Sequence, residues 1–129
     1  MGYLFAFERL DVWQLARRFV KYTYSLIDNF PSKERYNLVD QIKRAATSIA
    51  LNLAEMTSRS SYKEQAHYSE IAYGSVIEVY CAFILSYDME YINEQQMKEV
   101  TEQIGELSNK INALKNSQYR RSEEFIKRR

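Results

Sequence analysis

A cysteine and a histidine can form a nucleophilic catalytic pair, and each occurs once among the 129 residues. They are His67 and Cys81, and an imidazole activates a thiol only within hydrogen-bonding reach. Both lie in one predicted helix, where their spacing of fourteen residues corresponds to about 21 Å along the axis. They cannot act together within one chain, so we expect Cys81 to be a small buried side chain.

A metal site is the second chemical possibility, because Glu64-Gln65-Ala66-His67 has the Glu-x-x-His spacing of helix-bundle di-iron sites. Such sites need two of these elements and two further glutamates, and the chain has one histidine. A surface histidine is the simpler interpretation, and a metal-dependent bundle enzyme is the weaker hypothesis. The sequence also lacks a P-loop, a dinucleotide fingerprint and a nucleophile elbow. We therefore expect no enzyme activity, no catalytic residue, no metal and no cofactor.

A stripe of polar residues follows the second predicted helix at steps of three and four, within about 60° of its surface. It adjoins the apolar side, so its members should be partly buried and need hydrogen-bonding partners, which the third helix can supply. We interpret the set as a structural network that fixes helix register or a subunit contact; a ligand site is the alternative. The network comprises Gln41, Arg44, Ser48, Asn52, Glu55, Ser75 and Glu78.

Basic residues gather on the first helix, around the turn between the second and third helices, and in the C-terminal tail. Phosphates bind such groups, and an oligomer would multiply a modest patch. Ordinary solvated charge is an equally good interpretation. The candidate residues for binding RNA or DNA are Arg17, Arg18, Lys21, Lys43, Arg44, Arg59, Lys63, Arg120 and Arg121.

The composition is that of one packed domain with long helices. Hydrophobic residues make up 46% of the chain, and three glycines and one proline leave few tight turns. The net charge of +1 does not by itself indicate a nucleic-acid binder. Its distribution is uneven, however: residues 66–115 hold three basic and eight acidic residues, whereas 1–65 hold ten and seven. A chain with this charge distribution can bind positively or negatively charged partners, or a neighbouring copy of itself.

Apolar periodicity predicts four helices, at about residues 7–29, 33–57 and 62–88 and from residue 94 onward. Ser32, Ser61 and Asn93 are the expected N-caps. The fourth helix carries an a/d heptad seam from Met97 to Leu114. Because the connections are short, we predict an all-α protein, an antiparallel up-down-up-down four-helix bundle over residues 1–115. Residues 116–129 should form a basic C-terminal extension that frays or protrudes.

The third helix is apolar or aromatic around its whole circumference. A helix of this kind is normally covered on all sides, which one four-helix bundle cannot do. We therefore expect self-association, with an alternative in which exposed tyrosines simply tolerate water. The candidate oligomer interface is Val76, Tyr80, Phe83, Ile84 and Tyr87.

The single cysteine suits a reducing cytosol, and the N-terminal residues show no signal-peptide pattern. The uncharged stretch from Val79 to Tyr87, like every other in the chain, falls far short of the roughly 20 residues that a membrane helix needs. We expect a cytoplasmic protein without a membrane partner.

The second and third helices resemble a known family, the four-helix bundle proteins encoded within intervening sequences of bacterial 23S ribosomal RNA genes. The resemblance covers about residues 7–115. Its relatives include the accessory variability determinant of diversity-generating retroelements. One departure is Met56, where the family usually has glycine. The matching runs are Gln41–Ile49, Asn52–Glu55, Gly74–Glu78, Leu10–Trp13 and Phe30-Pro31.

This resemblance implies an antiparallel bundle that assembles as a homopentamer with a basic surface, and it carries over no catalytic residue. In the retroelement relatives such an assembly binds a reverse transcriptase and nucleic acid. The leading hypothesis is therefore a non-enzymatic homo-oligomeric scaffold, a homopentamer, that binds RNA or DNA. The alternative is an adaptor whose protein partner is a nucleic-acid enzyme such as a reverse transcriptase.

Overall fold

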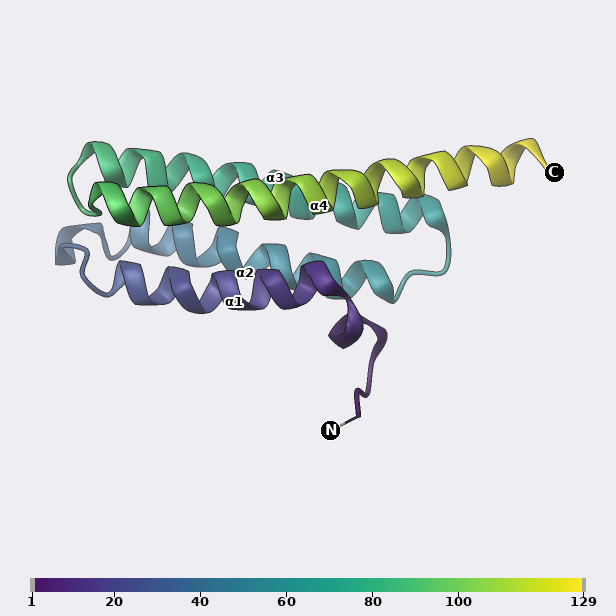
Figure 1. Cartoon of the computed structure of the whole chain (residues 1–129), viewed down its shortest axis with the longest axis horizontal. Coiled ribbons are helices and arrows are strands. Elements are labelled where there is room, and N and C mark those ends of the chain that lie inside the picture. The colour runs from purple at the N-terminus through teal and green to yellow at the C-terminus, as the bar shows by residue number, and fades with distance from the viewer. Residues whose placement is uncertain (1, 129) are drawn as a thin grey trace.

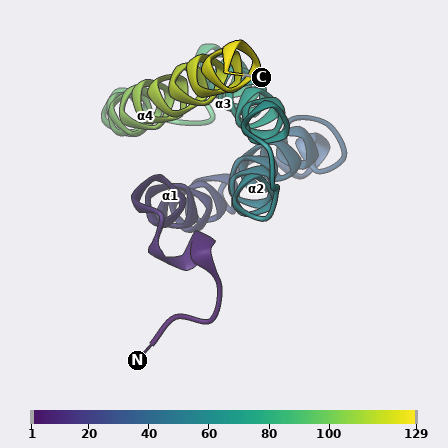
Figure 2. The same ribbon diagram turned by 90° about the vertical axis from the view of Figure 1, so that its right-hand side faces the viewer.

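The computed structural model describes residues 2–128, which form four helices and no strands (Figure 1). These are α1 (Asp11–Ile27), α2 (Leu38–Thr57), α3 (Tyr62–Asp88) and α4 (Glu94–Lys127). Successive helices run antiparallel, so the predicted up-down-up-down bundle is confirmed. Viewed end-on, α1 and α2 form one side of the bundle and α3 and α4 the other, with α1 and α3 at opposite corners (Figure 2).

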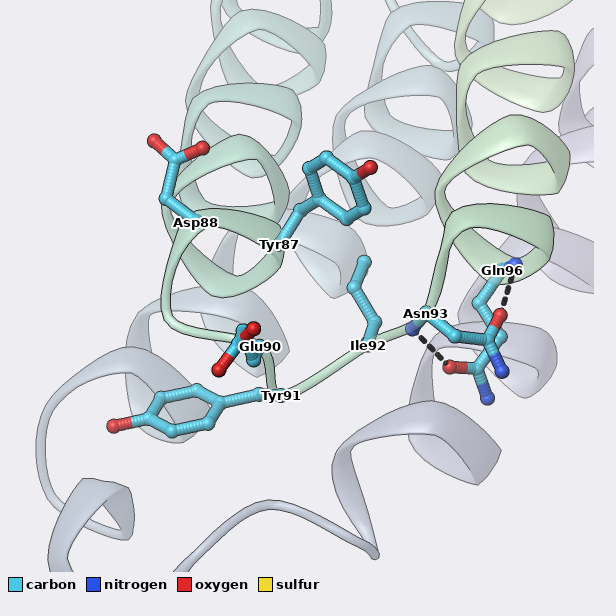
Figure 3. A pocket seen from close by; sticks show the side chains of 7 residues that line it. All are labelled: Tyr87, Asp88, Glu90, Tyr91, Ile92, Asn93 and Gln96. Atoms are coloured by element: carbon cyan, nitrogen blue, oxygen red, sulfur yellow. Dashed lines mark hydrogen bonds between the residues drawn. The ribbon is translucent and has the colours of Figure 1, made fainter.

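The starts of α3 and α4 agree with the predicted caps. The Ser61 hydroxyl accepts a 3.1 Å hydrogen bond from the Glu64 amide. Asn93 and Gln96 form a full capping box, each side chain accepting a 2.8 Å bond from the other residue's amide (Figure 3). These bonds satisfy amides that have no partner within the helix.

The first two helices begin later than predicted. A 3-10 turn over Ala6–Arg9 precedes α1, and another over Ser32–Glu34 precedes α2. Ser32 therefore does not cap α2, whose N-cap Asn37 has a non-helical backbone. The cause is tertiary: the buried Glu34 accepts 2.8 Å and 3.2 Å bonds from the Tyr91 hydroxyl and the Asn37 amide, which hold this turn against the α3–α4 connection.

The end of α3 is a Schellman motif with a glutamate where glycine is usual. Glu90 has a φ of 64°, in the left-handed region. Its amide donates to the Tyr87 carbonyl, and the Tyr91 amide donates to the Ser86 carbonyl, both at 2.9 Å. This pair of bonds defines the motif. It turns the chain so that the Tyr91 ring packs against Phe30, with centroids 5.3 Å apart.

The core lies between the two helix pairs. The Phe19 and Phe83 rings meet edge to face across it, with centroids 6.5 Å apart, and join the diagonally opposed helices α1 and α3. The heptad seam of α4 is confirmed: four of its residues are buried and its two ends are half-buried. The buried seam residues are Val100, Ile104, Leu107 and Ile111.

The C-terminal stretch was expected to fray or to protrude, and the structure shows the second of these. α4 continues without interruption through residue 116 to Lys127 and extends past the other helices (Figure 1). The described part of this stretch therefore protrudes as a helix instead of fraying; Arg129 lies outside it. Contacts with the start of α3 hold this part of the helix. The Ser69 hydroxyl donates a buried 2.7 Å bond to Gln118, and the Tyr119 hydroxyl donates a 2.8 Å bond to Glu70.

Candidate nucleic-acid interface

The residues considered for catalysis do not form a site. His67 and Cys81 are both exposed on α3, so the expectation that Cys81 is buried is wrong. The reason is its position on the outward face of the helix. Among residues 2–128, no group of three His, Cys, Asp or Glu side chains lies close enough to hold a metal ion.

The predicted polar network exists only at its centre. The Ser75 hydroxyl of α3 donates a 2.8 Å bond to the Ser48 hydroxyl of α2, and the Asn52 amide donates a 2.9 Å bond to the same oxygen. The chain of three side chains joins the two helices between their ends. This geometry fits a structural link, because the three polar side chains form hydrogen bonds with one another.

The outer members of the predicted network bond elsewhere. Arg44 pairs with Asp40 at 3.1 Å, one turn away on the same helix. Glu55 pairs with Arg59 at 2.9 Å and also accepts from the Ser58 hydroxyl. Gln41 and Glu78 are exposed on α2 and α3. The structure therefore does not join these four residues to Ser48, Asn52 and Ser75.

Two of the five predicted interface residues are in the wrong place. Val76 and Phe83 are fully buried in the core of the single chain, and Tyr80 is half-buried against it. Ile84 and Tyr87 are each 39% exposed. The error arises because a helix that is apolar all round does not show which side faces its own core.

The exposed apolar residues of α3 form a stripe that the prediction partly missed. Ile77 is 53% exposed and Leu85 is 49% exposed. The stripe could have been found from the sequence by plotting these residues around the helix, once the side of the helix that is buried in the core is known. We call this surface the α3 outer face; its residues are Ile71, Gly74, Ile77, Cys81, Ile84 and Leu85.

By length and composition α3 also qualifies as a membrane-spanning helix, with a mean hydropathy of 1.2 in its most apolar window. However, 44% of that window is buried inside the bundle. A core helix of a soluble protein has the same properties, so this feature is weak evidence for a membrane segment.

The nine candidate basic residues fall into three groups. Arg44 and Arg59 are engaged in ion pairs within α2 and at its end. Lys63, Arg120 and Arg121 are exposed near the projecting end of α4, where the Arg121 guanidinium lies 5.6 Å from the centre of the Tyr62 ring. The third group, which we call the α1 cluster, consists of Arg17, Arg18, Lys21 and Lys43.

The α1 cluster is exposed and free of ion pairs. Within the described part of the chain, no carboxylate lies within 4.0 Å of any of its four charged groups. The one acid of α1, Asp11, pairs instead with Lys110 of α4 at 2.9 Å. That hydrogen bond and the charge of Lys110 hold the pKa of Asp11 below its usual range. Lys63, Arg120 and Arg121 likewise have no ion pair in the described part of the chain, so what distinguishes the α1 cluster is that it holds four such cations on two neighbouring helices.

The end of the bundle at the α3–α4 connection is unsuitable for phosphate. A hollow of about 680 Å³ lies at the α3–α4 connection, and Asp88 and Glu90 line it together with Tyr87 and Tyr91 (Figure 3). None of its lining residues is basic. Two carboxylates without a facing cation would repel a nucleic-acid backbone.

The sequence matches the 23S rRNA-intervening sequence protein family over residues 8–113. This chain belongs to that family. A comparison with curated proteins found no match. For this 23S rRNA-intervening sequence protein, the family match includes the α1 cluster and the α3 outer face. It ends before Gln118, so the projecting end of α4 with Arg120 and Arg121 lies outside the matched residues.

Proposed function

We propose that this chain is a non-enzymatic, cytoplasmic scaffold that assembles with copies of itself, as a homopentamer, and binds nucleic acid through its basic surface. The observation that carries the proposal is the position of two unsatisfied surfaces at opposite corners of one bundle. The α1 cluster offers unpaired cations, and the α3 outer face offers exposed aliphatic side chains. Since α1 and α3 are diagonally opposed, both surfaces can be engaged at once (Figure 2).

Assembly is the first part to test. Exposed apolar patches of this kind mark interaction sites, and closed homo-oligomers bury such a patch on every subunit. Light scattering on the purified chain should give five times the 15.4 kDa mass of one subunit. Leu85→Glu should dissociate the assembly, whereas Leu4→Glu, in the N-terminal segment at 82% exposure, should not. A wild-type protein that stays at 15.4 kDa at micromolar concentration would contradict the proposal.

Nucleic-acid binding is the second part. Fluorescence anisotropy with a structured RNA should show affinity that falls steeply with salt, because bound phosphates release counterions. Lys21→Ala should weaken binding to all sequences and reduce the salt slope by about one. Lys98→Ala, an exposed lysine of α4 in the acidic half of the chain, is the matched control and should leave binding unchanged. Binding that is absent or insensitive to salt would remove nucleic acid from the function.

The second candidate function is an adaptor for a nucleic-acid enzyme such as a reverse transcriptase. The α3 outer face is the feature that favours it, because a different protein could cover the same aliphatic side chains. A monomer in light scattering that forms a stoichiometric complex with a purified reverse transcriptase would support this candidate over self-assembly. A homo-oligomer that binds RNA without such a partner would support the first.

A further inference from the structure

Two aromatic rings flank cations of the α1 cluster along one line of the bundle. Trp13, Arg17, Lys21 and Tyr24 follow one another on α1 at steps of four, four and three. Such steps place side chains on one side of a helix. Lys43 of α2 joins the same line from the neighbouring helix, because its ammonium lies 5.5 Å from the centre of the Tyr24 ring. We call these five residues the α1 row.

The cations and rings of the α1 row are already close to one another. The Arg17 guanidinium lies 5.7 Å from the centre of the Trp13 ring system, and Phe7 packs edge-on against that ring at 4.8 Å between centroids. Tyr24 is 39% exposed, and Trp13 is half-buried against the core. An aromatic ring can stack on a base of a nucleic acid, while a neighbouring cation without an ion pair binds the phosphate of the same nucleotide.

We propose that the α1 row is a track for single-stranded nucleic acid, in which Tyr24 and Trp13 stack on unpaired bases and Arg17, Lys21 and Lys43 hold the backbone. This inference rests on the proposed nucleic-acid binding and names the form of the ligand. From Trp13 to Tyr24 the track is about 16 Å long at ~1.5 Å per residue. At the ~3.4 Å spacing of a stacked strand, that length corresponds to four or five bases.

A single strand fits this surface better than a duplex. Stacking on a side-chain ring requires an exposed base face, which paired bases inside a duplex do not offer. The α1 row combines rings with unpaired cations, the pattern typical of sites that bind single strands without strong sequence preference. The other cation–ring contacts are single pairs, whereas the α1 row places two rings and three cations along one line. In one of those pairs, Arg59 over Tyr68, the cation is also bound to Glu55.

Trp13 provides a direct optical test, because it is the one tryptophan of the chain. The full-length protein is titrated with an oligothymidylate and an oligouridylate of about 15 nucleotides, near the upper site size of a single binding fold. A blunt hairpin duplex of equal length is the comparison. We expect tryptophan fluorescence to be quenched by the single strands, with affinity at least fivefold higher than for the duplex.

Substitution of Tyr24 separates stacking from charge. Because stacking contributes about 1–3 kcal/mol per base, Tyr24→Leu should weaken single-strand binding roughly 5- to 150-fold. Tyr24→Phe keeps the ring and should bind like the wild type. The exposed position of Tyr24 makes both variants compatible with folding, which circular dichroism checks.

The outcomes distinguish this inference from the proposed function. Salt-dependent binding of structured RNA with no change in tryptophan fluorescence, and with Tyr24→Leu equal to the wild type, would overturn the track and leave nucleic-acid binding intact. Equal affinity for duplex and single strand would also overturn it. Failure of every nucleic acid to bind at low salt would overturn both.

Discussion

Ser69 and Gln118 form a fully buried hydrogen bond, 2.7 Å from the hydroxyl of α3 to the amide oxygen of α4. The Gln118 amide nitrogen points to the Met56 sulfur of α2 at 3.2 Å. One side chain of α4 thus contacts two other helices at the point where α4 leaves the bundle. This contact explains why the polar end of α4 is ordered as a helix beside α3.

Removal of the Ser69 hydroxyl should therefore weaken the projecting end of α4. Ser69→Ala leaves the Gln118 oxygen buried without a donor, which costs about 1–3 kcal/mol in the free energy of unfolding. Urea denaturation measures the loss, and hydrogen exchange should show faster exchange around residue 118. The exposed Glu123→Ala should change stability by no more than about 0.5 kcal/mol. Equal stability of the two variants would show that the bond contributes nothing.

The contact between Tyr22 of α1 and Glu99 of α4 should make stability depend on pH. The Tyr22 hydroxyl donates to the Glu99 carboxylate, and this bond lowers the pKa of Glu99 below its usual 4.5. The unfolded chain therefore takes up the Glu99 proton first as the pH falls. The stabilising contribution is present above about pH 4.5 and is lost as the pH falls through the folded-state pKa.

Tyr22→Phe tests this contribution. The free energy of unfolding, measured by urea between pH 7 and pH 3, should fall less steeply in the variant than in the wild type. Some loss remains, because the pKa values of Asp11 and Glu34 are also lowered, by Lys110 and by Tyr91. Tyr36→Phe is the control, since that ring is 86% exposed. Parallel curves for wild type and Tyr22→Phe would contradict the assignment.

Two neighbouring residues of α3 should respond differently to truncation. Phe83 is buried against Phe19, so Phe83→Ala should cost about 3–5 kcal/mol through lost burial and a cavity. Ile84 lies on the α3 outer face, so Ile84→Ala should weaken assembly in light scattering while changing the fold of each subunit little. Both are compared at one protein concentration, because stability and assembly are linked. A large loss of helix content in Ile84→Ala would contradict this division.

The left-handed conformation of Glu90 gives a stabilising substitution. A residue with a Cβ atom pays about 1–2 kcal/mol in this region, which glycine avoids. Glycine also gains freedom in the unfolded chain, so Glu90→Gly should raise stability by a net ~0.5–1 kcal/mol. Thermal unfolding should show a higher midpoint. A lower midpoint would mean that the Glu90 side chain itself stabilises the connection.

Local sequence features determined much of the fold. The caps at Ser61 and Asn93 act within one turn, so they marked the starts of α3 and α4 correctly. The seam from Met97 to Leu114 showed which side of α4 is buried, because its apolar residues occupy one side only. Charge alone also separated the basic and acidic parts of the chain.

Other features depended on contacts between residues far apart in the sequence, which no local pattern encodes. The start of α2 is displaced by the bond from Tyr91 to Glu34, 57 residues away. The helical order beyond residue 116 depends on Ser69, 49 residues before its partner. Packing against α2 and α4 decided which side of α3 is buried. The sequence could not show this, because apolar residues occur on all sides of the helix. Only the packing of α1 on α2 brings Lys43 to Tyr24 and completes the α1 row.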